Sequence, residues 1–355
     1  ILAIKNCTIM NIKEKKFLEN LINKYSKKNS SKKIAYPLIE SAFSSIDIYK
    51  GVEVLLSGQL TMAEITQEFE YEFAKYIGSK YALMVNSGSS ANLLAAFALV
   101  NPRKKNFLKK DDEFLIPVLC WPTSLWPMVQ AGLKPRFVDV DVDNFNMDMN
   151  EFKKKLTKKI KAIMSIHVLG NSTHIEEMAK IAKSRNIFLI EDTCESLGAK
   201  YKEKYLGTFG DFGTYSFYYS HQITSGEGGM IVCDSKTDYE LIYSMRSHGW
   251  ARKLKNSNNK DTSFTFINSG FNLRPLDISA AIGLNQFKRL NSMIKIRIKN
   301  REKIINRLMN SKQWNKQFSF LGTTKNVKPS FFGLPILISK KYLSQKKQFF
   351  NFLKK

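Results

Sequence analysis

The feature that most constrains this chain is the alternation of short apolar runs with helix-like segments between residues 81 and 234. Each apolar run has the length of a buried strand, and most are followed by a turn and a helical pattern; the clearest runs are 81–85, 113–119, 161–170, 187–192 and 228–234. Strands that alternate with helices in this way are typical of a mostly parallel sheet covered by helices on both faces. We therefore predict an α/β fold with one large sheet.

Two other segments flank this region. Residues 1–50 are rich in lysine and have a helical pattern, and the sequence after about Pro275 is again strongly helical before it ends in a mixed segment. We therefore expect an N-terminal helical segment (1–50), a large domain (51–275) and a smaller C-terminal α/β domain (276–355). Because the chain ends soon after an apolar, strand-like run, we expect this last domain to be truncated.

Polar residues that directly follow the predicted strands are the first candidates for a site, because ligands of open parallel sheets bind beyond the carboxyl ends of the strands. The run 87–90 (SGSS) follows a strand and begins a helix. Its free N–H groups, together with the hydroxyls of Ser89 and Ser90, could bind a phosphate. Ordinary capping of a helix by serine explains the same run equally well.

Two further strand ends carry a carboxylate and an aromatic ring. The run 187–192 ends in Asp192, with Glu195 one turn later. A buried carboxylate there needs a partner, such as a pyridinium N–H, a salt bridge or solvent. Trp121 follows the strand 113–119, where its flat ring could stack on a planar cofactor or pack in the core.

The segment 216–229 (SFYYSHQITSGEGG) adds Ser216 and His221 at the same predicted edge. The unperturbed pKa of histidine is about 6.5, so His221 could both accept and donate a proton near neutral pH. A hydrogen-bonded structural histidine is the alternative. The remaining candidates lie further along the chain, before a predicted helix: His248, Asn272 and Arg274.

Composition limits the other kinds of function. The net charge is +25, but the lysines form short, scattered clusters without a nucleic-acid motif, so we predict a solvated surface whose field attracts an anionic substrate rather than nucleic acid. The four cysteines form no CxxC pair, so we predict no metal site. The longest apolar run, 93–100, is far shorter than the roughly 20 residues of a membrane span, so we predict a cytoplasmic protein.

Taken together and in order, these motifs resemble those of the DegT/DnrJ/EryC1/StrS family of sugar aminotransferases, which use pyridoxal 5'-phosphate (PLP) on nucleotide-linked keto sugars. The resemblance extends from about Gly58 to Leu284 and is carried by 69–93, 137–148, 190–217, 226–232 and 270–275. It implies an aspartate-aminotransferase-like fold (PLP fold type I) and a homodimer with shared active sites. One small departure is Ala63, where the family usually has glycine.

Within this family, three features resemble one branch, the GDP-4-keto-6-deoxy-D-mannose 3-dehydratases. These are His221 at the position where most members carry lysine, the run 246–250 (RSHGW) and the run 271–275 (FNLRP). A sister branch that acts on CDP-sugars carries cysteine ligands for an iron–sulfur cluster. This chain has no such cysteine cluster, which counts against that branch.

The resemblance implies a role for each candidate residue. Asp192 would keep the pyridine nitrogen protonated, Trp121 would stack on the ring and Glu195 would lie near the ring hydroxyl. His221 would be the catalytic acid and base. The other implied contacts are with the cofactor phosphate (Ser89, Ser90, Ser216, and Asn272 from a partner subunit) and with the substrate (His248 and Arg274).

The histidine also bears on the reaction. In most PLP enzymes a lysine binds the cofactor covalently and moves protons. Histidine cannot make that bond, so the cofactor would be held non-covalently as PLP or as pyridoxamine 5'-phosphate (PMP). The resemblance implies removal of the C3 hydroxyl from a nucleotide-linked 4-keto-6-deoxyhexose, giving a 4-keto-3,6-dideoxy sugar for lipopolysaccharide O-antigen synthesis, with L-glutamate restoring PMP. The alternatives are a nucleotide-sugar aminotransferase and a non-catalytic relative that binds cofactor or sugar.

Overall fold

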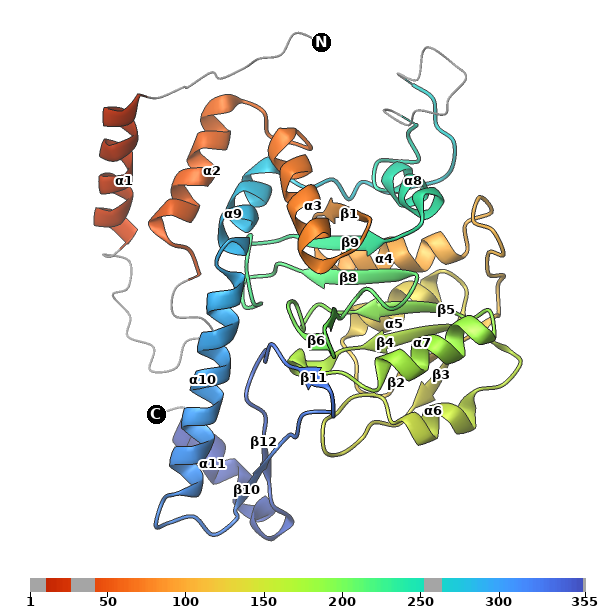
Figure 1. Ribbon diagram of the computed structural model, residues 1–355, viewed down its shortest axis with the longest axis vertical. Coiled ribbons are helices and arrows are strands. Elements are labelled where there is room, and N and C mark those ends of the chain that lie inside the picture. Colours follow the sequence, from red (N-terminus) through yellow and green to blue (C-terminus); the bar gives the residue numbers. More distant parts are fainter. Residues whose placement is uncertain (1–10, 27–41, 252–263, 354–355) are drawn as a thin grey trace.

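The computed structural model describes residues 11–26, 42–251 and 264–353. Its centre is a seven-stranded sheet (Figure 1). In spatial order its strands are β1 (Tyr81–Val85), β9 (Gly229–Cys233), β8 (Phe212–Ser216), β5 (Phe188–Asp192), β4 (Ile160–Ile166), β2 (Glu113–Pro117) and β3 (Lys134–Val138). The five strands from β8 to β3 run parallel, while β9 is antiparallel to both β1 and β8. The predicted α/β fold with a mostly parallel sheet is therefore confirmed.

Alternate side chains of the strands enter cores on opposite faces of the sheet, as the two-residue period of a strand requires. Leu83 and Val85 of β1 belong to a core that includes residues of α4 (Gly88–Leu99), α5 (Pro122–Gln130) and α8 (Lys236–Met245). Ala82 and Met84 of the same strand belong to a core with residues of α3 (Glu64–Ile77) and α9 (Asp277–Phe287). A third core contains residues of α6 (Met149–Lys155) and α7 (Ile175–Ser184). Helices thus cover both faces of the sheet.

At one side of the sheet, helix α2 (Ser45–Ser57) packs against α9, and helix α1 (Ile12–Ser26) lies on the outer side of α2 (Figure 1). A capping box begins α2, because Ser44 and Asp47 each accept a hydrogen bond from the backbone of the other. The buried carboxylate of Asp47 also accepts from Asn285 of α9 (2.6 Å) and from Arg289 (2.8 and 2.7 Å). Helix α2 runs across residue 50, and the predicted division into three parts stays a prediction.

The C-terminal part begins with the long helix α10 (Leu290–Met309), which leads away from the large sheet (Figure 1). A two-stranded sheet of β10 (Phe318–Phe320) and β12 (Ile336–Ile338) follows, with the final helices η2 (Lys340–Gln345) and α11 (Lys346–Leu353). Between these strands, β11 (Val327–Lys328) returns to pair with β6 (Lys200–Tyr201), which also pairs with β7 (Lys204–Tyr205). The C-terminal part is therefore tied back to the large domain close to the carboxyl end of β5.

In the described part of the chain, no helix is both long enough and apolar enough to span a bilayer. Within the same residues there is no group of three or more His, Cys, Asp and Glu side chains that could hold a metal ion.

Candidate active site

The carboxylate of Asp192 lies buried at the carboxyl end of β5 and is held by three donors. Its Oδ2 accepts from Asn92 Nδ2 (2.8 Å) and Ser124 Oγ (2.7 Å), and its Oδ1 accepts from the N–H of Cys194 (3.1 Å). Hydrogen bonds to a carboxylate are among the stronger ones in proteins, so three of them fix its orientation. The donors are all neutral, which leaves the negative charge available to a cationic ligand.

Asn92 and Ser124 were missed from the sequence. Both are polar side chains in the first two turns of the helices α4 and α5, and both are buried. Thr214 of β8 completes the set by donating to Asn92 Oδ1 (2.6 Å). Both lie in the first turns of helices that directly follow strands of the sheet, and this position is a signal that could have found them.

The start of α4 lies directly against the end of β8. Ser87 is the N-cap and accepts from the N–H of Ser90 (3.1 Å), so helix capping involves Ser87. The side chain of Ser89 is exposed and donates to Thr123 Oγ1 (3.0 Å). Gly88 touches Ser216 so closely that an added Cβ would lie 2.5 Å from Ser216 Cβ and 3.0 Å from Ser216 Cα. The helix N-terminus and Ser216 therefore lie side by side, which brings together the kinds of donor that a phosphate requires.

Gly88→Ala should weaken phosphate binding at this surface. The added Cβ would meet backbone and Cβ atoms of Ser216, which cannot move away as a flexible side chain could. Overpacking of this kind costs about 1–3 kcal/mol, and if that strain displaces the phosphate donors we expect the dissociation constant for PLP to rise by about 5- to 150-fold. Equilibrium dialysis with PLP and with pyridoxal, which lacks the phosphate, measures the effect.

The matched control is Gly322→Ala, where the nearest atom to an added Cβ is 3.6 Å away. That variant should bind PLP as the wild type does. A Gly88→Ala protein whose preference for PLP over pyridoxal is unchanged would contradict the assignment of this surface to a phosphate.

Trp121 does not pack in the core. It is the N-cap residue of α5, its side chain is 71% exposed, and it lies one turn before Ser124, which donates to Asp192. A large ring that is exposed one turn from Ser124, a partner of Asp192, is available to stack on a planar ligand.

His221 lies in the loop after β8, with its ring held between two aromatic side chains. The imidazole packs edge-to-face with Phe332 (5.0 Å between ring centroids) and with Tyr218 (5.9 Å). Its Nδ1 is buried, and no group in the described part of the chain forms a hydrogen bond with it. A buried nitrogen without a partner is costly, which indicates that a ligand or its proton completes this position.

The surroundings of His221 favour the neutral imidazole. Burial lowers the pKa of His221 to about 4; the Asp192 carboxylate opposes this and the Arg297 guanidinium adds to it. His221 therefore stays neutral, and able to accept a proton, well below the pH of about 6.5 at which a free histidine titrates. The influence of Asp192 also shows that the two predicted residues lie near each other.

Glu195 belongs to the same site. Its Oε2 accepts from the N–H of Leu169 (2.8 Å). Burial raises the pKa of Glu195, the Leu169 N–H partly offsets this, and the nearby Asp192 carboxylate raises it further. Glu191, the neighbour of Asp192, has a different role, because it accepts from the N–H groups of Gly207, Phe209 and Gly210 and so fixes a loop.

The other three predicted residues form a separate group. His248 is exposed with a left-handed backbone (φ 64°), and its N–H donates to the carbonyl of Phe271 (2.7 Å). Ser247 pairs with Asn272, whose Oδ1 accepts from Arg274 Nε (2.9 Å). None of the hydrogen bonds among the described residues links His248, Asn272 or Arg274 to Asp192 or His221, so their roles stay predictions.

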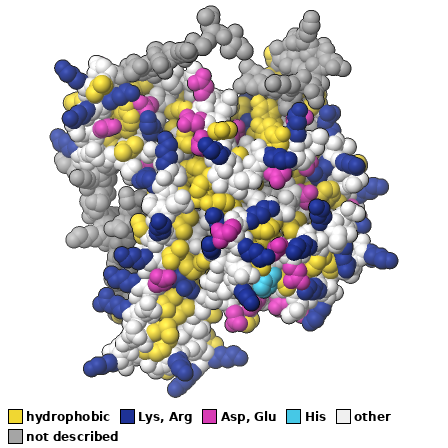
Figure 2. Space-filling model, viewed as in Figure 1, with side chains coloured by type: hydrophobic (Ala, Val, Ile, Leu, Met, Phe, Trp, Pro, Cys, Tyr) yellow, Lys and Arg dark blue, Asp and Glu magenta, His cyan; other side chains and the backbone are white. Residues whose placement is uncertain are grey.

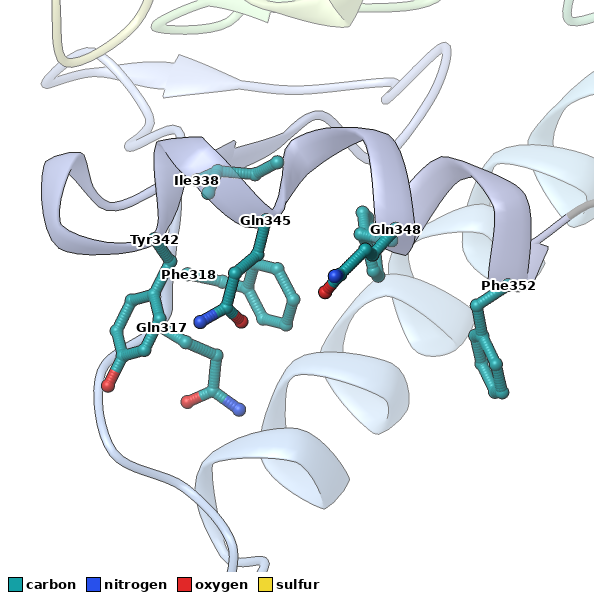
Figure 3. Close-up of a pocket in the computed structure, with 8 residues that line it drawn as sticks. Gln317, Phe318, Ile338, Tyr342, Gln345, Gln348 and Phe352 are labelled. Atoms are coloured by element: carbon teal, nitrogen blue, oxygen red, sulfur yellow. The ribbon is translucent and has the colours of Figure 1, made fainter.

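Two surface features lie apart from this site. Figure 2 shows lysine and arginine side chains scattered over the visible face among acidic and apolar ones. The C-terminal part contains a hollow of about 290 Å³. Aromatic, apolar and glutamine side chains from the region of β10, β12, η2 and α11 line it (Figure 3). None of the predicted site residues lines this hollow.

Comparison with known proteins places the chain in a family. The model of the DegT/DnrJ/EryC1/StrS aminotransferase family matches residues 46–355. A relative from Escherichia coli O55:H7, "GDP-4-keto-6-deoxy-D-mannose 3-dehydratase", is 39% identical over 318 residues, which are 86% of this chain and 80% of the relative.

Solved structures agree with this result. The E. coli GDP-4-keto-6-deoxy-D-mannose-3-dehydratase with bound hydrated PLP has a TM-score of 0.83 and 38% identity, over 89% of this chain and 82% of that one. The structure of a GDP-4-keto-6-deoxymannose-3-dehydratase with a trapped PLP-glutamate geminal diamine has a TM-score of 0.82 and 38% identity over the same shares. The aminotransferase-like fold is thus shared with enzymes that bind PLP, and the chain belongs to the DegT/DnrJ/EryC1/StrS aminotransferase family.

Proposed function

We propose that this protein is a PLP/PMP-dependent nucleotide-sugar 3-dehydratase that removes the C3 hydroxyl from GDP-4-keto-6-deoxymannose. The product would be a 4-keto-3,6-dideoxy sugar of the kind used in lipopolysaccharide O-antigens. The observation that carries the proposal is His221, a neutral buried imidazole with a free Nδ1 near Asp192. Relatives named as 3-dehydratases with this nucleotide sugar support the choice of reaction and carrier.

The site fits the cofactor at both of its ends. Gly88 lacks the Cβ that would close the space against Ser216, so the start of α4, with Ser89, Ser90 and Ser216, can hold the phosphate. The exposed ring of Trp121 can stack on the pyridine ring, whose protonated nitrogen the Asp192 carboxylate can bind. Because His221 cannot form the covalent bond of a lysine, these contacts would hold PLP or PMP non-covalently.

The cofactor, when bound as PMP, supplies an amine that condenses with the sugar ketone and a ring that takes up electrons. The chain supplies the proton transfer. Nδ1 of neutral His221 can accept a proton, and the nearby Asp192 carboxylate stabilises the imidazolium that results. That imidazolium can return the proton to the departing C3 hydroxyl, so one residue serves as base and then as acid. Phe332 and Tyr218 keep the ring in one orientation during both steps.

The two alternatives fit the site less well. An aminotransferase that returns an amine in each cycle relies on a lysine, which position 221 lacks. A non-catalytic relative would not need the fixed Asp192 carboxylate together with the free Nδ1 of His221. The glutamate adduct named in one related structure supports L-glutamate as the amino donor that restores PMP.

A homodimer with shared active sites is also part of the proposal. Asn272 and His248 are exposed, and among the described residues they form no hydrogen bond with Asp192 or His221 of their own chain, as expected of residues that serve a partner's site. Around Trp121, the exposed side chains of Val118, Leu119 and Trp126 offer apolar area to a second copy. A cytoplasmic location stays a prediction.

Incubation of the protein with PLP, L-glutamate and a panel of GDP-, CDP-, UDP- and dTDP-linked 4-keto-6-deoxy sugars tests the function. We expect mass spectrometry to show loss of the C3 oxygen, with the highest turnover on the GDP sugar. Protein loaded with PMP and given no glutamate should stop after one turnover, and protein given PLP alone should form no product. Gain of an amine in place of oxygen loss would identify an aminotransferase, and no change on any sugar would identify a non-catalytic relative.

A further inference from the structure

Arg297 of α10 donates to the backbone of His221 from a position 76 residues away in the sequence. One guanidinium nitrogen, Nη2, donates to the carbonyl of His221 (3.1 Å). The other, Nη1, donates to the carbonyl of Phe332 (2.8 Å), whose ring packs against the His221 imidazole. One side chain therefore fixes both the backbone of the histidine and the residue that flanks its ring.

Phe332 is held from the other side as well. Its N–H donates to the carbonyl of Leu169 (3.2 Å), and the N–H of Ser330 donates to the carbonyl of Gly170 (3.1 Å). The N–H of Leu169 in turn donates to Glu195. Residues 330–332 thus join helix α10 to the turn at 169–170, which is itself bonded to Glu195, and the Phe332 ring packs against the His221 ring.

The charge of Arg297 matters in addition to its geometry. The side chain is partly buried, burial lowers its pKa, and both of its partners are carbonyl oxygens rather than a carboxylate. Within the described residues no salt bridge neutralises its positive charge, which therefore acts on the imidazole. The charged groups that act on His221 are Asp192 from β5 and Arg297 from α10; Tyr218 packs against its ring, and Glu195 lies close to Asp192.

We propose that Arg297 is a positioning residue for the reaction: it holds His221 and Phe332 by their carbonyls so that the imidazole is presented as a neutral base with Nδ1 free. This inference rests on the proposed dehydratase function for its catalytic meaning. The effect of Arg297 on the titration of His221 does not depend on that function, and it can be measured on the protein without cofactor or substrate.

The chain has four histidines, so NMR of protein labelled at the histidine ring carbons can follow each one as the pH changes. His221→Asn identifies the His221 signal. In the wild type, we expect His221 to titrate at about pH 4. In Arg297→Met, removal of the nearby positive charge should raise that midpoint by about one pH unit. Arg297→Lys, which keeps the charge, should stay close to the wild type.

Turnover gives the second measurement. Loss of the two carbonyl contacts should lower kcat in Arg297→Met by about tenfold with a smaller change in KM, because misplaced catalytic groups slow the chemical step. Arg297→Lys should recover part of kcat, and the acidic limb of the Arg297→Met pH profile should move upward with the His221 midpoint. If Arg297→Met does not fold by circular dichroism, Arg297→Gln replaces it in both measurements.

Arg301 provides a matched control. It lies one turn further along α10, donates to the carbonyl of Leu321 (2.6 Å) and lies over the ring of Phe331 (4.4 Å), but it does not contact His221. Arg301→Met should leave the His221 midpoint unchanged. An unshifted midpoint in Arg297→Met, or an equal shift in Arg301→Met, would overturn the inference. Absence of dehydration in the wild type would instead refute the proposed function, and the NMR result would still stand.

Discussion

His221→Asn should lower the rate of C3 deoxygenation by about 10²- to 10⁴-fold, the usual contribution of a general acid and base, and leave cofactor binding nearly intact. Asparagine is similar in length and can occupy the same space between Phe332 and Tyr218. It cannot accept a proton near neutral pH, so neither proton transfer proceeds. The phosphate contacts at Ser216 and the Asp192 carboxylate lie on other elements and should be unaffected.

A single-turnover experiment separates an effect on the rate of deoxygenation from an effect on cofactor binding. Protein loaded with PMP is mixed with the GDP sugar, product is followed by mass, and PMP affinity is measured by dialysis. His174→Asn is the matched control, because His174 contacts Tyr201 (3.4 Å) and has no contact with the site. Product formed by His221→Asn at the wild-type rate would remove His221 from the catalytic role, whereas loss of PMP binding would assign it to cofactor binding.

The sheet edge and its main residues could be predicted because strands and their ends are local features of the sequence. Asp192 and Ser216 are the last residues of β5 and β8, and adjacent parallel strands bring their ends together. The two-residue period of a strand also explains why Glu191 and Asp192, which are neighbours in β5, have different roles. Neighbouring side chains of a strand point to opposite faces, so Glu191 fixes the 207–210 loop while Asp192 faces the site.

The residues that hold His221 in place could not be predicted. Arg297 and Phe332 belong to segments that pack against the site only in the folded chain, and nothing in their local sequence patterns distinguishes them from other basic or aromatic residues. The partners of Asp192 are an intermediate case. Asn92 and Ser124 lie close to strand ends, but only the packing of α4 against α5 shows that they share one carboxylate.

A second prediction concerns the stability of the fold, which depends on a buried ion pair between Arg246 and Glu70. Arg246 Nη1 donates to Glu70 Oε1 (2.8 Å) and to the carbonyl of Met84 (2.7 Å), and Glu70 Oε1 also accepts the N–H of Met84 (2.8 Å). Burial raises the pKa of Glu70, while Arg246 and the Met84 N–H act against that rise. Removing one partner of such a pair leaves a buried charge without compensation, so Arg246→Met should lower the free energy of unfolding by about 3–5 kcal/mol.

Urea unfolding measures this loss, and its pH dependence tests the cause. Without Arg246 the pKa of Glu70 should rise further, so the folded state binds a proton more readily than the unfolded state does. The loss in free energy of unfolding caused by Arg246→Met should therefore be smallest below the ordinary glutamate pKa of about 4.3. It should grow as the pH rises through the pKa that Glu70 has in the folded variant. Lys328→Met, which breaks the exposed pair with Glu203, should change stability by at most about 1 kcal/mol.

A double-mutant cycle shows whether the loss belongs to the pair. Glu70→Gln with Arg246→Met removes both charges, so the double variant should be more stable than the sum of the single losses predicts. Strict additivity would mean that the two residues act independently.

Arg246 is also connected to the start of α4 through the backbone. Its carbonyl accepts the N–H of Leu273 (3.0 Å), and the carbonyl of Leu273 accepts the N–H of Asn86 (3.2 Å), directly before the 87–90 turn. If this chain of bonds supports the phosphate surface, Arg246→Met should bind PLP more weakly even where it is fully folded, and unchanged PLP affinity would limit the pair to stability alone.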